Sequence, residues 1–150
     1  MRIGYNTNGL AHHRLTDAIT LLADEGYQSV AITLDAGALD PYEEPAAFRK
    51  QLQNVREILE KRQLGCVIET GARFLLNPRK KHDPTLLDPS PERRDLRTDF
   101  LIRAIDIAAE LNADAVSFWS GALSEDTSET AALERLTAAL RPIIGHAEAR

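Results

Sequence analysis

The chain has 150 residues, of which 43% are hydrophobic and 27% charged, and its formal net charge is −5 at pH 7. This length suits one domain with a buried core, and the acidic balance argues against nucleic acid or an anionic membrane as a partner. The single cysteine, Cys66, excludes an internal disulfide and is typical of a reducing cytosol. No apolar stretch approaches the roughly 18 residues that a membrane helix needs. We therefore expect one cytoplasmic domain over residues 1–150, without a targeting signal.

The first part of the chain predicts two strand–helix units. An apolar run over 2–7 predicts the first strand, and the helix after it is expected to stop at Gly26. The run 29–34 is almost entirely apolar or β-branched, which favours a strand covered on both faces. Pro45 is suited to begin the second helix, whose apolar stripe continues until Gly65 is expected to end it.

A third strand is predicted over 66–70, and the longest irregular segment of the chain, 71–95, follows it. Several prolines and the basic cluster 79–82 fall in this segment. Connections of this length inside a compact domain are usually functional or disordered. An apolar stripe that begins at Leu96 then predicts the third helix, with Asn112 suited to a left-handed cap.

The fourth strand is predicted over 115–119, and a fourth helix follows it. Asp126 and Glu129 have the spacing of a capping box for this helix, and Pro142 predicts a kink or a new turn within it. Strands that alternate with helices in this way predict a parallel sheet with helical crossovers. In such folds the functional residues lie at the carboxyl ends of the strands.

Alternate residues of a strand share one face, and in each predicted strand this set changes character along its length. The residues are small at the amino end and polar or aromatic at the carboxyl end. Such a gradient is typical of the inside of a barrel that is packed at the bottom and opens as a polar pocket at the top. The polar or aromatic members are Asn6, Asn8, Asp35, Glu69 and Trp119.

Four segments together resemble a known family. They are RIGYNTN at 2–8, GYQSVAITLD at 26–35, VIETGARF at 67–74 and AIDIAAELNADAVSFWSG at 104–121. In order and spacing they resemble the first four β/α units of a xylose isomerase-like TIM barrel, the superfamily of sugar and sugar-phosphate isomerases and epimerases. The resemblance covers essentially the whole chain and implies an α/β fold, the amino-terminal half of a (β/α)8 barrel with parallel strands.

In that superfamily a divalent metal (Mn, Mg, Co or Zn) is typically held by carboxylates and a histidine at the ends of strands five to eight. Two of the carboxylates act there as acid and base. The resemblance therefore implies a metal-dependent sugar or sugar-phosphate isomerase or epimerase in its complete form. Because this chain has no fifth to eighth strand, we expect it to supply residues of the substrate pocket, with no metal ligand, no catalytic pair and no activity alone.

The superfamily also contains endonuclease IV, which uses extra histidines at the ends of strands three and four. Here these ends hold Glu69-Thr70 and Trp119-Ser120. This difference, together with the acidic charge, argues against a nuclease.

Each candidate site residue has a functional and a structural interpretation. Glu69 could hold sugar hydroxyls in a barrel mouth, or point outward into a salt bridge. Asp35 could accept bonds from the substrate, or begin a turn. Asn6 and Asn8 suit polyol recognition, but asparagines at strand ends also bond to their own backbone.

The remaining candidates lie on loops or at the last strand end. His12 and His13 are neighbours that point to opposite sides, so that one could reach the pocket rim. Arg73 and His82 could hold a phosphate or carboxylate, although charge runs are more often solvated. Trp119 could stack on a sugar ring or pack in the core.

Two other interpretations stay open. A half-barrel could be a non-catalytic binding or assembly module, with a homodimer formed through its open sheet edges. A doubly wound sheet of the flavodoxin type is weaker, because no phosphate-binding loop is apparent. A small-molecule sugar or sugar phosphate is the expected ligand in the first interpretation.

Overall fold

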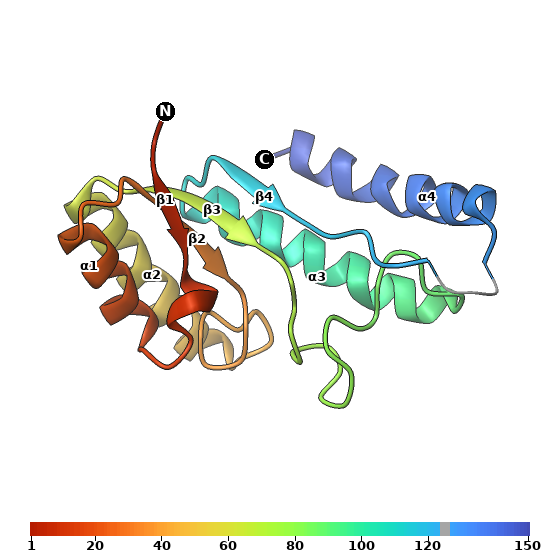
Figure 1. Cartoon of the computed structure of the whole chain (residues 1–150), viewed down its shortest axis with the longest axis horizontal. Helices are drawn as coiled ribbons and strands as arrows, with labels where there is room; N and C mark the ends of the chain where they lie inside the picture. Colours follow the sequence, from red (N-terminus) through yellow and green to blue (C-terminus); the bar gives the residue numbers. More distant parts are fainter. Residues whose placement is uncertain (124–126) are drawn as a thin grey trace.

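The computed structural model describes residues 1–123 and 127–150, in which strands and long helices alternate along the chain (Figure 1). The strands form one parallel sheet in the order β1-β2-β3-β4. Their bounds are Gly4–Asn6 for β1, Ser29–Thr33 for β2, Gly65–Glu69 for β3 and Ala115–Ser117 for β4. Sequential strands that pair in parallel require helical crossovers, so the predicted half of a β/α barrel is confirmed.

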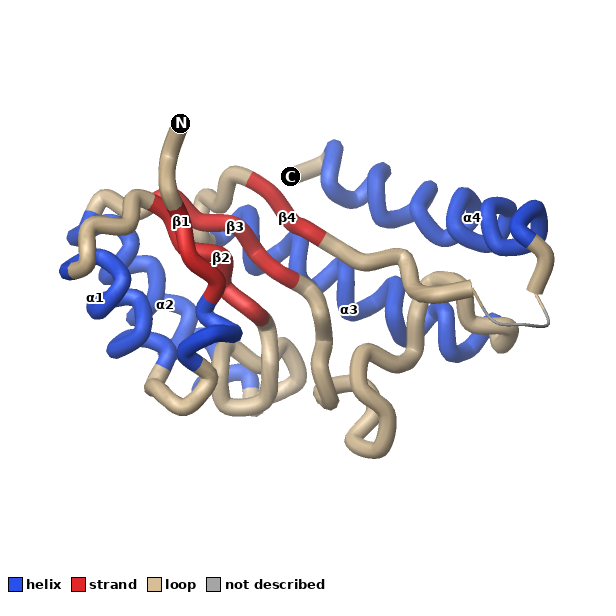
Figure 2. Tube along the Cα trace, viewed as in Figure 1, coloured by secondary structure: helices blue, strands red, loops and turns tan. Residues whose placement is uncertain are grey.

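Among the described residues, four α-helices and one short 3-10 helix connect and follow these strands, and their course is drawn in Figure 2. The 3-10 helix η1 comes directly after β1, and α1 and α2 lie against each other, as do α3 and α4. The bounds are Thr7–Leu10 for η1, Leu15–Asp24 for α1, Pro45–Arg62 for α2, Pro91–Glu110 for α3 and Glu129–Glu148 for α4.

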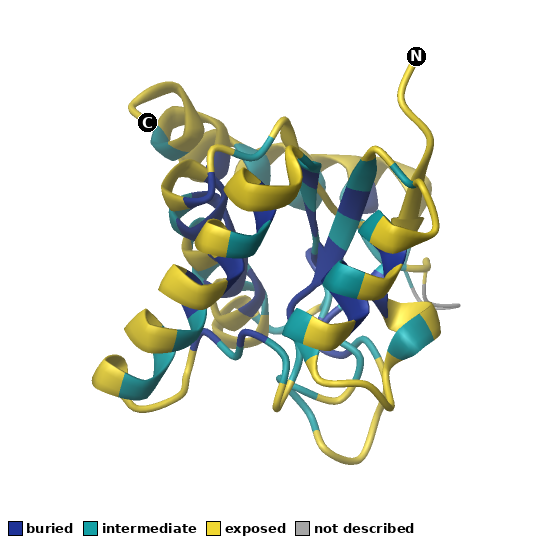
Figure 3. Cartoon of the chain, turned by 90° about the vertical axis from the view of Figure 1, so that its left-hand side faces the viewer, coloured by how far each residue is buried: buried dark blue, intermediate teal, exposed yellow. Residues whose placement is uncertain are grey.

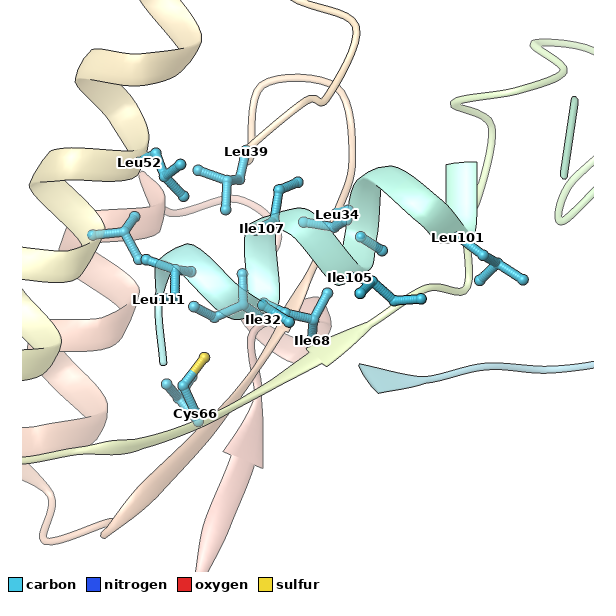
Figure 4. Close-up of a cluster of buried hydrophobic side chains, with 14 of the residues drawn as sticks. Ile32, Leu34, Leu39, Leu52, Cys66, Ile68, Leu101, Ile105, Ile107 and Leu111 are labelled. Atoms are coloured by element: carbon cyan, nitrogen blue, oxygen red, sulfur yellow. The ribbon is translucent and has the colours of Figure 1, made fainter. Parts of the chain in front are cut away.

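The hydrophobic core lies between the sheet and the helices (Figures 3 and 4). Val30, Ile32, Cys66 and Ile68 alternate along β2 and β3 and are all buried. The residues between them face the opposite side of the sheet, which in a closed barrel is the interior. This inner face carries small side chains in one register row, Ala31, Val67 and Ala115.

The end of α2 differs from the sequence prediction. Gly65 does not end α2; the helix ends at Arg62, and Gln63 takes the left-handed conformation with φ of 54°. Gly65 is instead a residue of β3, where the guanidinium of Arg2 lies in the place of a Cβ. Asn112 does take the expected left-handed conformation, with φ of 51°.

The third and fourth helices also needed correction. α3 begins at Pro91, inside the segment predicted to be irregular, because Ser90 Oγ caps it by accepting a bond from Arg93 N. Leu96, expected on its buried stripe, is exposed. α4 continues through Pro142 without a break, because the residues around the proline pack on α3.

The predicted capping box of α4 includes Asp126, which lies outside the described residues. The observed N-cap is Ser128, whose Oγ accepts a hydrogen bond of 3.2 Å from Ala131 N. Within the described part of the chain, no helix is both long and apolar enough to cross a membrane.

Candidate functional site

Three polar side chains meet where β1, β2 and β3 end. Thr33 pairs in register with Glu69, and its Oγ1 lies 2.9 Å from Glu69 Oε2 and 2.8 Å from Asn6 Oδ1. Asn6 Oδ1 also accepts a bond of 2.8 Å from Asn8 N, the local backbone contact that asparagine favours at such places. A threonine hydroxyl has one proton and can donate it to one of the two oxygens at a time. The other oxygen is left to accept a hydrogen bond from a ligand.

His82 and Trp119 stand beside this cluster. The two rings are in edge-to-face contact, with centroids 5.9 Å apart and an interplanar angle of 75°. His82 Nδ1 donates a hydrogen bond to the carbonyl oxygen of Gly71. A Cβ at Gly71 would lie 3.0 Å from Glu69 Oε1 and 3.4 Å from His82 Cε1. Glycine at this position therefore lets the carboxylate and the imidazole share one site.

Trp119 follows β4 and does not belong to it. The residue is 45% exposed, so it does not belong to the core that the described residues form. An aromatic face that is half open to solvent at the strand ends can pack against an apolar face of a bound molecule.

Arg97 is a site residue that the sequence analysis missed. It is 1% exposed, lies on α3 and donates from Nη2 to the carbonyl oxygen of Thr70 over 2.6 Å. Thr70 Oγ1 in turn donates to Ser117 O, so this arginine fastens the ends of β3 and β4 together. Burial lowers the pKa of Arg97 to about 10, while the nearby charge of Glu69 raises it in part. Nε and Nη1 have no hydrogen-bond partner among the described residues.

A small cavity of about 70 Å³ opens beside the cluster, between the ends of β1 and β2 and the start of α1. Asn8, Asp35 and Arg73 line it, together with Thr33 of the cluster and His13. Arg73 Nη1 lies 3.4 Å from Asp35 Oδ2, and Asp35 Oδ1 accepts a bond of 2.9 Å from Ala36 N. Asp35 thus both begins a turn and faces the cavity.

Of the two neighbouring histidines, His13 lines this cavity, and His12 is exposed and lies outside its lining. The basic cluster after β3 is likewise divided. Arg79, Lys80 and Lys81 are exposed, whereas His82 turns inward to Gly71. The structure therefore brings His82, but not its three basic neighbours, into the site.

Asp83 explains how this loop is held. Its carboxylate is buried and bonds to Arg93, Asn77 and Lys80. Burial alone would raise the pKa of Asp83, but the hydrogen bonds from Arg93, Asn77 and Lys80 outweigh it and keep the pKa below its ordinary value. The buried carboxylate anchors the residue that follows His82 and thereby fixes the histidine.

The described residues do not form a metal centre. Over 1–123 and 127–150, no group of three or more His, Cys, Asp or Glu side chains is arranged to hold an ion. Burial raises the pKa of the Cys66 thiol to about 12, and the charge of Asp114 adds to this effect. A buried thiol in this state is a core residue and a poor metal ligand or nucleophile.

Comparison with known proteins identifies the family. Residues 19–150 match the model of the xylose isomerase-like TIM barrel, and the chain belongs to this family. None of the curated proteins compared with it matches.

Solved structures resemble the chain over almost its whole length. D-psicose 3-epimerase, crystallised in the presence of D-fructose, has a TM-score of 0.71 and 14% identity; the match covers 99% of this chain and 49% of that one. For 3-keto-D-glucoside 4-epimerase from E. coli the TM-score is 0.70 at 13% identity, with 99% and 52% covered. D-allulose 3-epimerase from Methylomonas sp. gives 0.65 at 15% identity, with 99% and 48% covered. The chain thus spans about half the length of these structures, and at such identities the likeness shows the fold.

Proposed function

We propose that this chain forms the sugar-binding wall of a sugar isomerase or epimerase. The observation that carries the proposal is the cluster of Asn6, Thr33 and Glu69 at adjacent strand ends, with Trp119 beside it. The family and the epimerases of similar fold support the same class of ligand. A sugar presents hydroxyls on its edges and C–H groups on its faces, and the cluster offers acceptors together with an aromatic surface.

In this proposal the side chains bind and orient the substrate. The Glu69 carboxylate accepts a hydrogen bond from one sugar hydroxyl, and a charge-assisted bond of this kind is stronger than a neutral one. Thr33 then directs its single proton to Asn6, which keeps both oxygens of Glu69 available as acceptors. His82 is held by Gly71 and borders the same space.

The metal and the acid–base pair, which the family resemblance implies, are proposed to come from residues outside this chain. Glu69 is one carboxylate without a second and third metal ligand among the described residues. This chain alone is then expected to bind sugar without turning it over. We also retain a cytoplasmic location and the absence of a nucleic-acid partner as proposals, on the buried free thiol and the net charge of −5.

Completion of the barrel would require four further β/α units. A groove of about 630 Å³ runs between α3, β4 and α4 and is lined mainly by apolar side chains. Its apolar lining and the free edge of β4 suit a fifth strand with its helix. The inner row Ala31, Val67 and Ala115 is small, so bulky residues of the other half would have to fill the interior.

The single tryptophan provides a direct test. Trp119 lies next to His82 at the strand ends, so its fluorescence should change saturably as D-fructose is added. Glu69→Gln removes the charged acceptor and is expected to weaken binding about tenfold or more. Glu57→Gln makes the same change at an exposed position of α2 and should leave binding unchanged. An equal effect of both variants would contradict the proposal.

A second candidate is a non-catalytic assembly module in which two copies join through their open edges. Exposed Ile3 and Tyr5 on one edge and Phe118 on the other favour such a surface. Two copies would, however, contribute the same small inner row twice and leave the interior underfilled. Size-exclusion chromatography with light scattering distinguishes the two candidate functions. A stable dimer of about twice 16.6 kDa would favour the assembly module.

A further inference from the structure

The small cavity beside the cluster carries information about which sugars fit. It lies between η1, the start of α1 and the turn after β2, and Thr33 belongs both to its lining and to the cluster. A sugar whose hydroxyl is bound at Glu69 therefore has this cavity within reach of its chain. At about 70 Å³ the cavity has room for a small polar group such as a hydroxymethyl group.

The charges in the cavity are already balanced. Arg73 is the cationic residue that reaches it from the loop after β3, and Asp35 pairs with it at 3.4 Å. Both side chains are largely shielded, 32% and 20% exposed, so solvent screens their interaction only in part. A phosphate placed here would meet the Asp35 carboxylate as well as Arg73, because both side chains line the cavity and are paired with each other.

The hydrogen-bonding groups suit a neutral ligand instead. A hydroxyl can donate to Asp35 and accept from Arg73 without breaking their pair, and Asn8 offers a further donor and acceptor. Leu10, Ala36 and Ala38 form apolar walls against which a methylene group can pack. This combination of one carboxylate, one guanidinium and apolar walls matches a hydroxymethyl group.

We propose that the cavity formed by Asn8, Asp35 and Arg73 binds the uncharged hydroxymethyl end of a sugar and excludes a phosphorylated end. This inference rests on the proposed sugar-binding function and adds the substrate class: free sugars and not sugar phosphates. Arg73, held in place by Asp35, donates a hydrogen bond to the hydroxyl of the ligand, and Asp35 is the residue that sets the specificity.

The test compares three probes on the ¹⁵N-labelled chain by NMR at pH 8, where a phosphate ester is dianionic. D-Fructose should shift the amide signals of Asn8, Thr33 and Ala36 saturably. D-Fructose 6-phosphate should bind about tenfold more weakly or worse, and inorganic phosphate should not saturate these signals. Tighter or equal binding of the phosphate ester to the unmodified chain would overturn the proposal while leaving sugar binding intact. Absence of shifts with both sugars would instead contradict the proposed function.

A pair of variants locates the effect. Asp35→Asn frees the charge of Arg73 and is expected to move the ratio of ester to free-sugar affinity about tenfold toward the ester. Asp40→Asn removes the same charge from the same loop outside the cavity and keeps an oxygen for the bond from Tyr42 N. The ratio should stay unchanged in this control. An equal change in both variants would show that the net charge of the loop, and not the cavity, sets the preference.

Discussion

Replacing Arg97 by methionine should separate stability from ligand binding. Arg97 is fully buried under the strand ends, with one hydrogen bond to Thr70 O and two N–H groups that have no partner among the described residues. Burying a cation costs desolvation free energy. A protein that keeps a buried cation despite this cost typically uses it to support a functional site. Methionine keeps much of the volume and removes the charge.

The magnitude follows from the burial of the guanidinium. A pKa lowered from 12.5 to about 10 corresponds to roughly 3 kcal/mol by which the folded state disfavours the charge at neutral pH. Arg97→Met removes this cost but leaves the buried Thr70 carbonyl without its donor, at about 1–3 kcal/mol. The difference between these two terms predicts that Arg97→Met is as stable as the unmodified chain or up to about 2 kcal/mol more stable. Binding of D-fructose should nevertheless weaken, because the ends of β3 and β4 lose their common anchor and Glu69 loses a nearby positive charge.

Urea unfolding followed by circular dichroism gives the free energy, and Trp119 fluorescence gives the affinity. Arg103→Met is the matched control on the same helix: it removes an exposed ion pair with Asp99 and should change stability by about 1 kcal/mol or less. The reasoning about Arg97 would be refuted by a loss of more than about 2 kcal/mol, which would make Arg97 a structural residue. If Arg97→Met is stable and its affinity for D-fructose is unchanged, Arg97 does not position the sugar-binding residues.

Three further predictions concern single residues. The stability of the chain should fall as pH rises above 9, because the pKa of the Cys66 thiol is 9.0 in the unfolded chain while burial holds it near 12 in the folded one. At pH 10.5 the loss of unfolding free energy is about 2 kcal/mol relative to pH 8. An equal loss in the variant Cys66→Ala would contradict this. Ser128→Ala should cost about 1 kcal/mol in urea unfolding, since its Oγ caps α4; no loss would show that the cap is dispensable. Gly71→Ala should weaken D-fructose binding severalfold with little change in stability, because the new Cβ would lie 3.0 Å from Glu69 Oε1. If fluorescence titration gave the same affinity as for the unmodified chain, the site geometry would be contradicted.

The strand–helix order could be predicted because hydrophobic periodicity reports burial directly. The apolar residues Ile32 and Ile68 alternate with less hydrophobic ones and are buried as this pattern predicts. Asn112 takes the left-handed conformation, which asparagine adopts more readily than most residues at the end of a helix. Gln63 could not be predicted in the same way, because a left-handed non-glycine residue is imposed by the turn into β3. Pro142 does not start a new turn, and α4 continues through it while packing on α3.

The candidate site could be predicted in part. Glu69 and Trp119 stood out as polar or aromatic residues at strand ends, but their meeting with Thr33 and His82 depends on strand register and on the course of a long loop. Arg97 was missed because an arginine within an apolar stripe is ordinarily assigned to the surface. Its spacing of three, four and seven residues before Phe100, Leu101 and Ala104 was the signal that could have placed it on the buried face.

A crystal structure of this chain with D-fructose tests the central claim most directly. The account predicts the sugar at the carboxyl ends of the strands, with a hydroxyl within hydrogen-bond distance of Glu69 and one face against Trp119. It further predicts a terminal hydroxymethyl group between Asp35 and Arg73. Sugar bound elsewhere while the strand ends remain free of it would contradict the account.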